Sequence, residues 1–196
     1  MILLFNRWDT KDVKVEDLGL KKYINLKPII VPRTGGRWIP NLHKERVNIV
    51  ERFMNKLMVP GHRGKKHKIT SGHCPANIQN IYLSTKEAFE IIEKRLKANP
   101  VQIFIKAIEN SAIVEEIAAY RLGGIIARKA VVVSPQRRLD LALRHLAQGV
   151  YSSCFRKKKT LAEAIAEEII AAYQNDQKCF AIRERQRIEK EAEGAR

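Results

Sequence analysis

The sequence is poor in cysteine and has no long apolar run. Its three cysteines, Cys74, Cys154 and Cys179, are widely spaced and form no CxxC pair, so we expect no disulfide framework and a reducing, cytoplasmic setting. No apolar run approaches the roughly 18 residues of a membrane-spanning helix. The apolar start ends at Phe5, short of the roughly 7–15 residues of a secretory core. We therefore expect a soluble protein that has no membrane partner.

Motifs for catalysis and for metal binding are also missing. The chain has no dinucleotide-binding glycine motif, no phosphate-binding P-loop and no nucleophile elbow. His62, His67 and His73 lie near Cys74, but their spacing matches no paired-ligand zinc pattern. The acidic residues gather at expected helix starts and helix surfaces, where capping and solvation explain them. We expect no catalytic residue, no metal and no cofactor.

Positive charge, by contrast, is abundant. The 196 residues include 37 Lys+Arg and 21 Asp+Glu, for a net charge of +16, and 45% are hydrophobic, which excludes a wholly disordered basic tail. Residues 33–68 carry +8 and residues 121–159 carry +9, so these two windows hold the whole excess. A solvated face would explain one such run. Two windows that share only three acids indicate a polyanionic partner, and nucleic acid is favoured over an anionic membrane.

Apolar spacing and capping signals predict mostly helices. Prolines and paired glycines predict an irregular N-terminal extension over residues 1–43, with at most a short strand near 29–31. A helix is predicted over 44–59, loop-like chain over 61–83, and a helix that begins at Ser84, where Glu87 would complete a capping box. Cap-plus-proline signals predict helices after residues 99 and 134. Thr160 and Glu163 cap another helix, buried as far as Tyr173, and residues 178–193 form a last, charged helix.

Gly123 and Gly124 separate two β-prone arms, residues 113–121 and 125–133. Paired glycines supply the positive φ that tight turns require, so we predict a hairpin. The predicted fold class is mainly α: a single helical domain of about six helices over residues 44–196, with a projecting two-stranded β-hairpin at about 113–133. Because an isolated ribbon is marginally stable, we expect its charges to serve binding and to add little to the core.

The position of the charge favours RNA over duplex DNA. It falls on loops, the hairpin and helix ends, which suits an irregular RNA recognised by shape and backbone. Arg137 and Arg138 occupy the first turn of a helix, where cations are unfavourable, so we predict that they share a phosphate with the helix N-terminus. Trp38, Tyr151 and Phe155 could stack on bases, although the last two fit a buried stripe better. The candidate RNA-binding residues are Arg33, Arg37, Lys44, Arg46, Arg63, Lys65, Lys66, Lys68, Arg121, Arg128, Lys129, Arg137, Arg138, Arg144, Arg156, Lys157, Lys158 and Lys159.

Several segments resemble the small-subunit ribosomal protein seven family in its archaeal and eukaryotic form. They are residues 47–52, 64–66, 88–92, 99–110, 123–124, 131–138 and 142–144, and residues 8, 23–26 and 35–37 resemble the archaeal-type extension. The resemblance implies a protein that binds small-subunit rRNA in the subunit head and helps the head assemble. It also implies partners among the ribosomal proteins of the head, a hairpin near exit-site tRNA and mRNA, and a cytoplasmic location in the ribosome. The alternative is a free-standing regulatory or processing RNA-binding protein.

Overall fold

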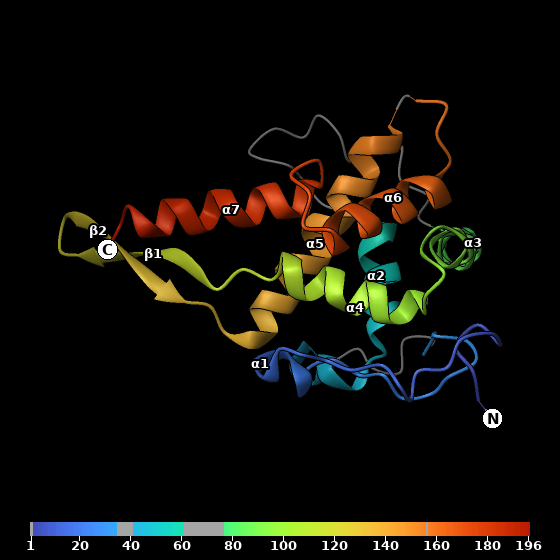
Figure 1. Ribbon diagram of the computed structural model, residues 1–196. Coiled ribbons are helices and arrows are strands. Elements are labelled where there is room, and N and C mark those ends of the chain that lie inside the picture. Colours follow the sequence, from blue (N-terminus) through green and yellow to red (C-terminus); the bar gives the residue numbers. More distant parts are fainter. Residues whose placement is uncertain (1, 35–40, 61–76, 156) are drawn as a thin grey trace.

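A computed structural model describes residues 2–34, 41–60, 77–155 and 157–196. Figure 1 shows a helical body from which a two-stranded hairpin projects, and this confirms the predicted mainly α fold class. Along the described chain the elements are α1 (Leu18–Lys21), the 3₁₀ helix η1 (Asn41–Arg46), α2 (Ile49–Met58), α3 (Ile78–Leu96), α4 (Pro100–Ser111), β1 (Glu115–Leu122), β2 (Ile125–Val132), α5 (Pro135–Cys154), α6 (Leu161–Tyr173) and α7 (Phe180–Glu193).

The main core lies where α4 is surrounded by the other helices of the body. The ring of Phe104 on α4 lies 5.1 Å from that of Phe53 on α2 and 5.8 Å from that of Phe89 on α3, and all three side chains are fully buried. Helix α6 packs against α3, α4 and α5. The stripe predicted for α5 is also fully buried, at Leu139, Leu143, Leu146 and Val150.

Local capping signals located three helix starts correctly. The Asn99 side chain accepts a hydrogen bond from the Val101 N–H at 3.0 Å, with Pro100 in the first turn of α4. Thr160 and Glu163 form the predicted capping box at the start of α6. Helix α5 begins at Pro135 as predicted, although the Ser134 side chain makes no capping hydrogen bond.

The prediction that a helix begins at Ser84 is wrong, because α3 begins six residues earlier at Ile78. The Asn77 side chain caps it by accepting from the Gln79 N–H at 2.9 Å. The inward stripe of α3 includes Ile81 and the fully buried Thr85. Because one buried position of the stripe is polar, the spacing of apolar residues alone does not show the helical period there.

Two further helix predictions need correction. Residues 44–48 do not belong to an α-helix: η1 occupies Asn41–Arg46, and Asn48 caps α2, which begins at Ile49. Tyr173 ends α6 with 41% of its surface exposed, so it does not continue the buried stripe. No strand forms at residues 29–31, but the carbonyl of Ile30 accepts a hydrogen bond from the Phe5 N–H.

The N-terminal arm, residues 2–34, lies against the body and its backbone is held by one polar stripe of α4. Asn99 Nδ2 donates to the Asp9 carbonyl at 2.8 Å. One helical turn on, the Gln102 side chain exchanges two hydrogen bonds with the backbone of Lys14. Glu109 then accepts from two arm amides, those of residues 16 and 17. Leu4, Phe5 and Trp8 of the arm are buried in the main core.

The hairpin is tightly registered and is supported at its base. Leu122 pairs with Ile125, so Gly123 and Gly124 form a two-residue turn, and Gly123 has a φ of +61°. Figure 1 shows α7 running beside the strands, and the Glu189 carboxylate of α7 accepts the Val114 N–H at 3.0 Å. Arg196 also binds the Glu115 carboxylate. From the sequence, the ribbon is expected to be isolated. The structure differs, because Glu189 and Arg196 brace the base of the ribbon.

The described residues include no helix that is both long enough and apolar enough to cross a membrane.

Candidate RNA-binding surface

Residues of both basic windows meet at one place on the body, between α2 and α5. Asp140 of α5 accepts a hydrogen bond from Lys44 Nζ at 3.0 Å and another from Arg52 Nη2 at 3.0 Å. Arg52 is only 7% exposed and also donates to the Tyr23 carbonyl, which ties the N-terminal arm to the same place. We refer to Lys44, Arg52, Lys56, Asp140 and Arg144 as the α2–α5 cluster.

The charges of this cluster are unbalanced. Burial disfavours the Asp140 carboxylate, but hydrogen bonds from Lys44 and Arg52 outweigh it and lower the pKa of Asp140. Lys56 is half-buried, and this burial lowers its pKa; Asp140 opposes the shift, whereas Arg144 adds to it. Among the described residues, the cluster thus holds four cations and one carboxylate, and that carboxylate is hydrogen-bonded by Lys44 and Arg52 alone. A phosphate beside Lys56 and Arg144 would favour the charged lysine and relieve their repulsion.

Lys56 was not among the residues predicted from the sequence. It lies four residues after Arg52 and off the apolar stripe of α2, which was the available signal. The sequence does not show that Arg144 lies near Lys56, because it is the packing of α2 against α5 that brings these two residues together.

The hairpin carries a second group of predicted residues. Arg121, Arg128 and Lys129 are exposed, and within the described chain none of them has a carboxylate partner. Apolar side chains at the tip are exposed beside them, Ile125 at 74% and Ile126 at 65%. The hairpin therefore presents both cations and apolar surface to a partner.

Arg137 and Arg138 are engaged with carboxylates of the chain itself. The Arg137 guanidinium binds Glu116 of β1 through two bonds, at 2.6 and 2.8 Å. Arg138 Nη2 donates to the Asp17 carboxylate at 2.8 Å, and its Nε donates to the Ile113 carbonyl. The predicted sharing of a phosphate with the N-terminus of α5 stays a prediction, and these intramolecular bonds compete with it.

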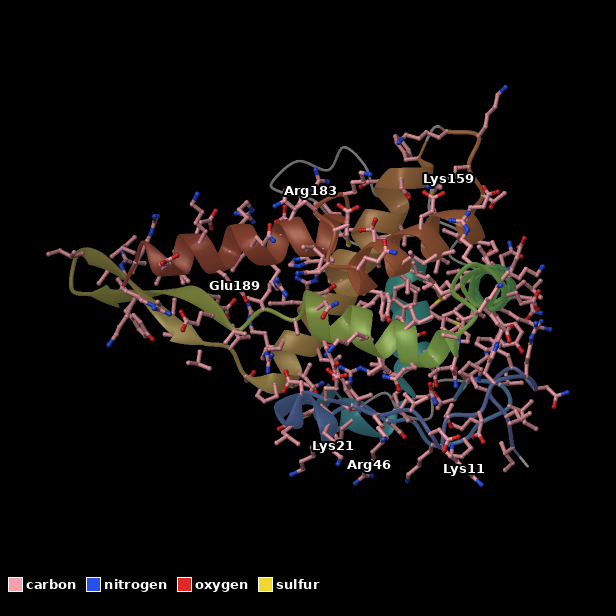
Figure 2. The ribbon with its side chains drawn as sticks, viewed as in Figure 1. Lys11, Lys21, Arg46, Lys159, Arg183 and Glu189 are labelled. Atoms are coloured by element: carbon pink, nitrogen blue, oxygen red, sulfur yellow. The ribbon has the colours of Figure 1, made fainter. Side chains whose placement is uncertain are left out.

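The remaining predicted residues are spread over the molecule. Arg33 is exposed within the N-terminal arm, Arg46 is exposed beside it, and Lys157 and Lys158 are exposed after α5. Lys159 forms an ion pair with Glu167, and in Figure 2 it lies at the opposite edge of the molecule from Arg46. Six predicted residues and one aromatic candidate lie outside the described residues: Arg37, Arg63, Lys65, Lys66, Lys68, Arg156 and Trp38.

Of the other aromatic candidates, Tyr151 is buried and its ring lies 5.4 Å from that of the partly buried Phe155. This agrees with the preference for a core role over base stacking. In the described ranges, His, Cys, Asp and Glu side chains form no group of three that could hold a metal ion. The histidines near Cys74 lie outside those ranges. Burial raises the pKa of the Cys179 thiol to about 12, so this thiol is unreactive at neutral pH.

Known proteins match nearly the whole chain. The family model described as ribosomal protein S7p/S5e matches residues 20–196. The chain is 50% identical over 194 residues to the small ribosomal subunit protein uS7 of Nanoarchaeum equitans, an alignment that covers 98% of each chain. It is 42% identical over 197 residues to the protein of the same name from Methanothermobacter thermautotrophicus, with complete coverage of both chains.

Proposed function

This chain belongs to the ribosomal protein S7p/S5e family, and from that premise we propose that it is a structural constituent of the small ribosomal subunit in the cytoplasm. In this proposal it binds small-subunit rRNA in the head, contacts neighbouring ribosomal proteins there and helps the head assemble. It has no catalytic role. The observation that carries the proposal is the α2–α5 cluster, where Asp140 is hydrogen-bonded by Lys44 and Arg52 while Lys56 lies within electrostatic range of Asp140 and of Arg144 from the other basic window.

The proposal assigns different tasks to the basic residues. Lys56 and Arg144 of the α2–α5 cluster, with the exposed Arg33 and Arg46, contact rRNA phosphates. The basic residues that follow α5 contribute in the same way. Arg137 and Arg138, whose guanidinium groups already bind carboxylates of the chain, support RNA binding by fixing the hairpin and the N-terminal arm.

We expect the full-length protein to remain on small subunits at stoichiometric amounts when they are sedimented in moderate salt. Many phosphate contacts made at once dissociate slowly, whereas a regulatory or processing factor would leave during the centrifugation. The measurement is the ratio of this protein to a reference protein of the subunit across a gradient. A mostly free pool would support the alternative of a free-standing regulatory or processing RNA-binding protein.

For the hairpin we propose a contact with exit-site tRNA and mRNA. Its exposed cations and its thin shape support this role, since they extend beyond the helical core (Figure 1). The base of the hairpin is held by Glu189 of α7 and by Arg196, which follows that helix, so the tip can be presented at a fixed angle.

Shortening the hairpin should separate assembly from this second role. Deleting residues 119–122 and 125–128 leaves Gly123-Gly124 between Ala118 and Lys129, which already pair. Because an even number of residues leaves each strand, the alternation of hydrogen-bonded pairs is kept. We expect folding and rRNA affinity to be retained, and exit-site tRNA to bind roughly 30-fold to 160-fold more weakly if Arg121 and Arg128 each lose a contact of roughly 1–1.5 kcal/mol. Thermal unfolding, rRNA titration and retention of deacylated tRNA measure the three effects.

The matched control keeps the length of the hairpin and removes only the charges of two arginines, with Arg121→Gln and Arg128→Gln. If the charged contacts carry the effect, this variant should release tRNA as the shortened hairpin does. Loss of rRNA binding on shortening, with tRNA retention unchanged, would overturn the assignment of the hairpin.

A further inference from the structure

The N-terminal arm has a basic surface that the total charge of its sequence conceals. Residues 1–32 contain six basic and four acidic residues, a nearly neutral balance that gave no reason to expect a binding site there. In the structure, the acidic and the basic side chains of the arm differ in their partners. Glu16, whose side chain is 65% exposed, pairs with Lys106 of α4, and the less exposed Asp17 pairs with Arg138 of α5. Cations of the body therefore neutralise half of the acids of the arm.

Within the described residues, the lysines of the arm have no such partners. Arg7 is the one arm cation of residues 2–32 with an ion pair in the described structure, to Glu90 and Glu93. The other five are exposed, and only Asp9 and Asp12 remain to balance them. We call these five lysines the arm surface: Lys11, Lys14, Lys21, Lys22 and Lys27.

The arm surface is held in place. The stripe of α4 fixes the backbone of residues 9–17, and Arg52 binds the Tyr23 carbonyl. The backbone of the arm is therefore already ordered before a ligand binds, which reduces the conformational entropy that binding would cost.

The arm surface also adjoins a predicted RNA-binding residue. Asn25 Nδ2 donates to the Arg46 carbonyl, and Asn48 Nδ2 donates to the Lys27 carbonyl at 3.3 Å. In Figure 2 the labelled side chains of Lys21, Arg46 and Lys11 all extend from the same edge of the molecule, away from α4. Arg46 and the labelled lysines of the arm thus lie at one edge of the molecule.

We infer that the arm surface is an additional RNA-binding site, which contacts the phosphate backbone of small-subunit rRNA through Lys21, Lys22 and Lys27 beside Arg46. This inference rests on the proposed function. Lysines recognise phosphates as point charges and carry no base specificity, so the site adds affinity and orientation. The ion pairs of Glu16 with Lys106 and of Asp17 with Arg138 neutralise two of the four arm carboxylates, which reduces their repulsion of a bound strand.

The test compares two triple variants of the full-length chain in binding to a transcript of the cognate small-subunit rRNA. The first carries Lys21→Gln, Lys22→Gln and Lys27→Gln. The control carries the same change at three exposed lysines elsewhere for which the described structure shows no ion pair, Lys94, Lys178 and Lys190. Each variant lowers the net charge from +16 by three, to +13, so a general loss of positive field is the same in both.

We expect the arm variant to bind on the order of tenfold to fiftyfold more weakly at 0.15 M salt, with a log–log salt slope shallower by roughly 2. The control should change little, and both should unfold at the wild-type temperature. Equal losses in the two variants, or none in either, would overturn the inference while leaving the proposed function intact. A loss of binding to anionic vesicles alone would also overturn it, in favour of a membrane. If the wild type itself bound rRNA without salt dependence, the proposed function would fail, and this inference with it.

Discussion

Raising the salt concentration from 50 to 200 mM should weaken binding of the intact protein to small-subunit rRNA by roughly 4 × 10³-fold to 3 × 10⁵-fold. With ~8–10 phosphates neutralised, log affinity should fall against log salt with a slope of about −6 to −9, because each phosphate contact releases condensed counterions. The net charge of +16 supplies enough cations for this number of contacts. Filter binding or fluorescence anisotropy over a salt series measures the slope.

The α2–α5 cluster provides the internal control for that experiment. Replacing Lys56 and Arg144 by Gln should make the slope shallower by about 1.5–2, while Asp140 keeps its bonds to Lys44 and Arg52 and the fold stays intact. A wild-type slope near zero would contradict the electrostatic account of both basic windows. An unchanged slope in the double variant would remove only the α2–α5 cluster from the binding surface.

The parts of the fold that could be predicted from the sequence are those specified by neighbouring residues. Asn99 with Pro100, and Thr160 with Glu163, satisfy backbone N–H groups within one turn, so these helix starts are local features. The turn at Gly123-Gly124 is local in the same sense. The start of α3 was missed because Thr85, although polar, occupies a buried position of its stripe.

The binding surface could be predicted only in part, since charge pairing depends on distant residues. Asp17 and Arg138 are 121 positions apart, and Glu16 and Lys106 are 90 apart. No local pattern indicates which cations are neutralised by such pairs. The sequence therefore identified the basic windows, but the excess charge of the arm surface depends on the pairing of Glu16 and Asp17 with distant cations, which no local pattern predicts.

Replacing Arg138 by Ala should lower the free energy of unfolding by about 2–4 kcal/mol. Its guanidinium connects three parts of the protein: α5, the Asp17 carboxylate of the arm and the Ile113 carbonyl at the base of the hairpin. The side chain is only 16% exposed and that of Asp17 28%, so truncation leaves a poorly solvated carboxylate and carbonyl without their donor. Chemical denaturation at neutral pH measures the loss.

The Arg138→Ala variant should also bind rRNA more weakly. The Asp17→Asn variant shows whether this loss arises from the displaced arm or from a lost phosphate contact. If Arg138 acts by holding the arm in place, Asp17→Asn should reduce rRNA affinity as well. It removes the charge that holds the arm, although the amide oxygen can still accept the Gly19 N–H and cap α1. The double variant should then be little weaker than Arg138→Ala alone, because both changes break one contact.

If Arg138 instead binds a phosphate directly, Asp17→Asn should raise the rRNA affinity and not lower it. Without the competing carboxylate at 2.8 Å, the guanidinium would be released toward the RNA and affinity would rise. We expect affinity to fall, because the Nε and Nη2 groups of Arg138 are both occupied within the protein. Arg138→Lys should restore affinity only in part, since a lysine cannot reproduce the two divergent bonds of a guanidinium. A rise in affinity on Asp17→Asn would instead make Arg138 a phosphate ligand.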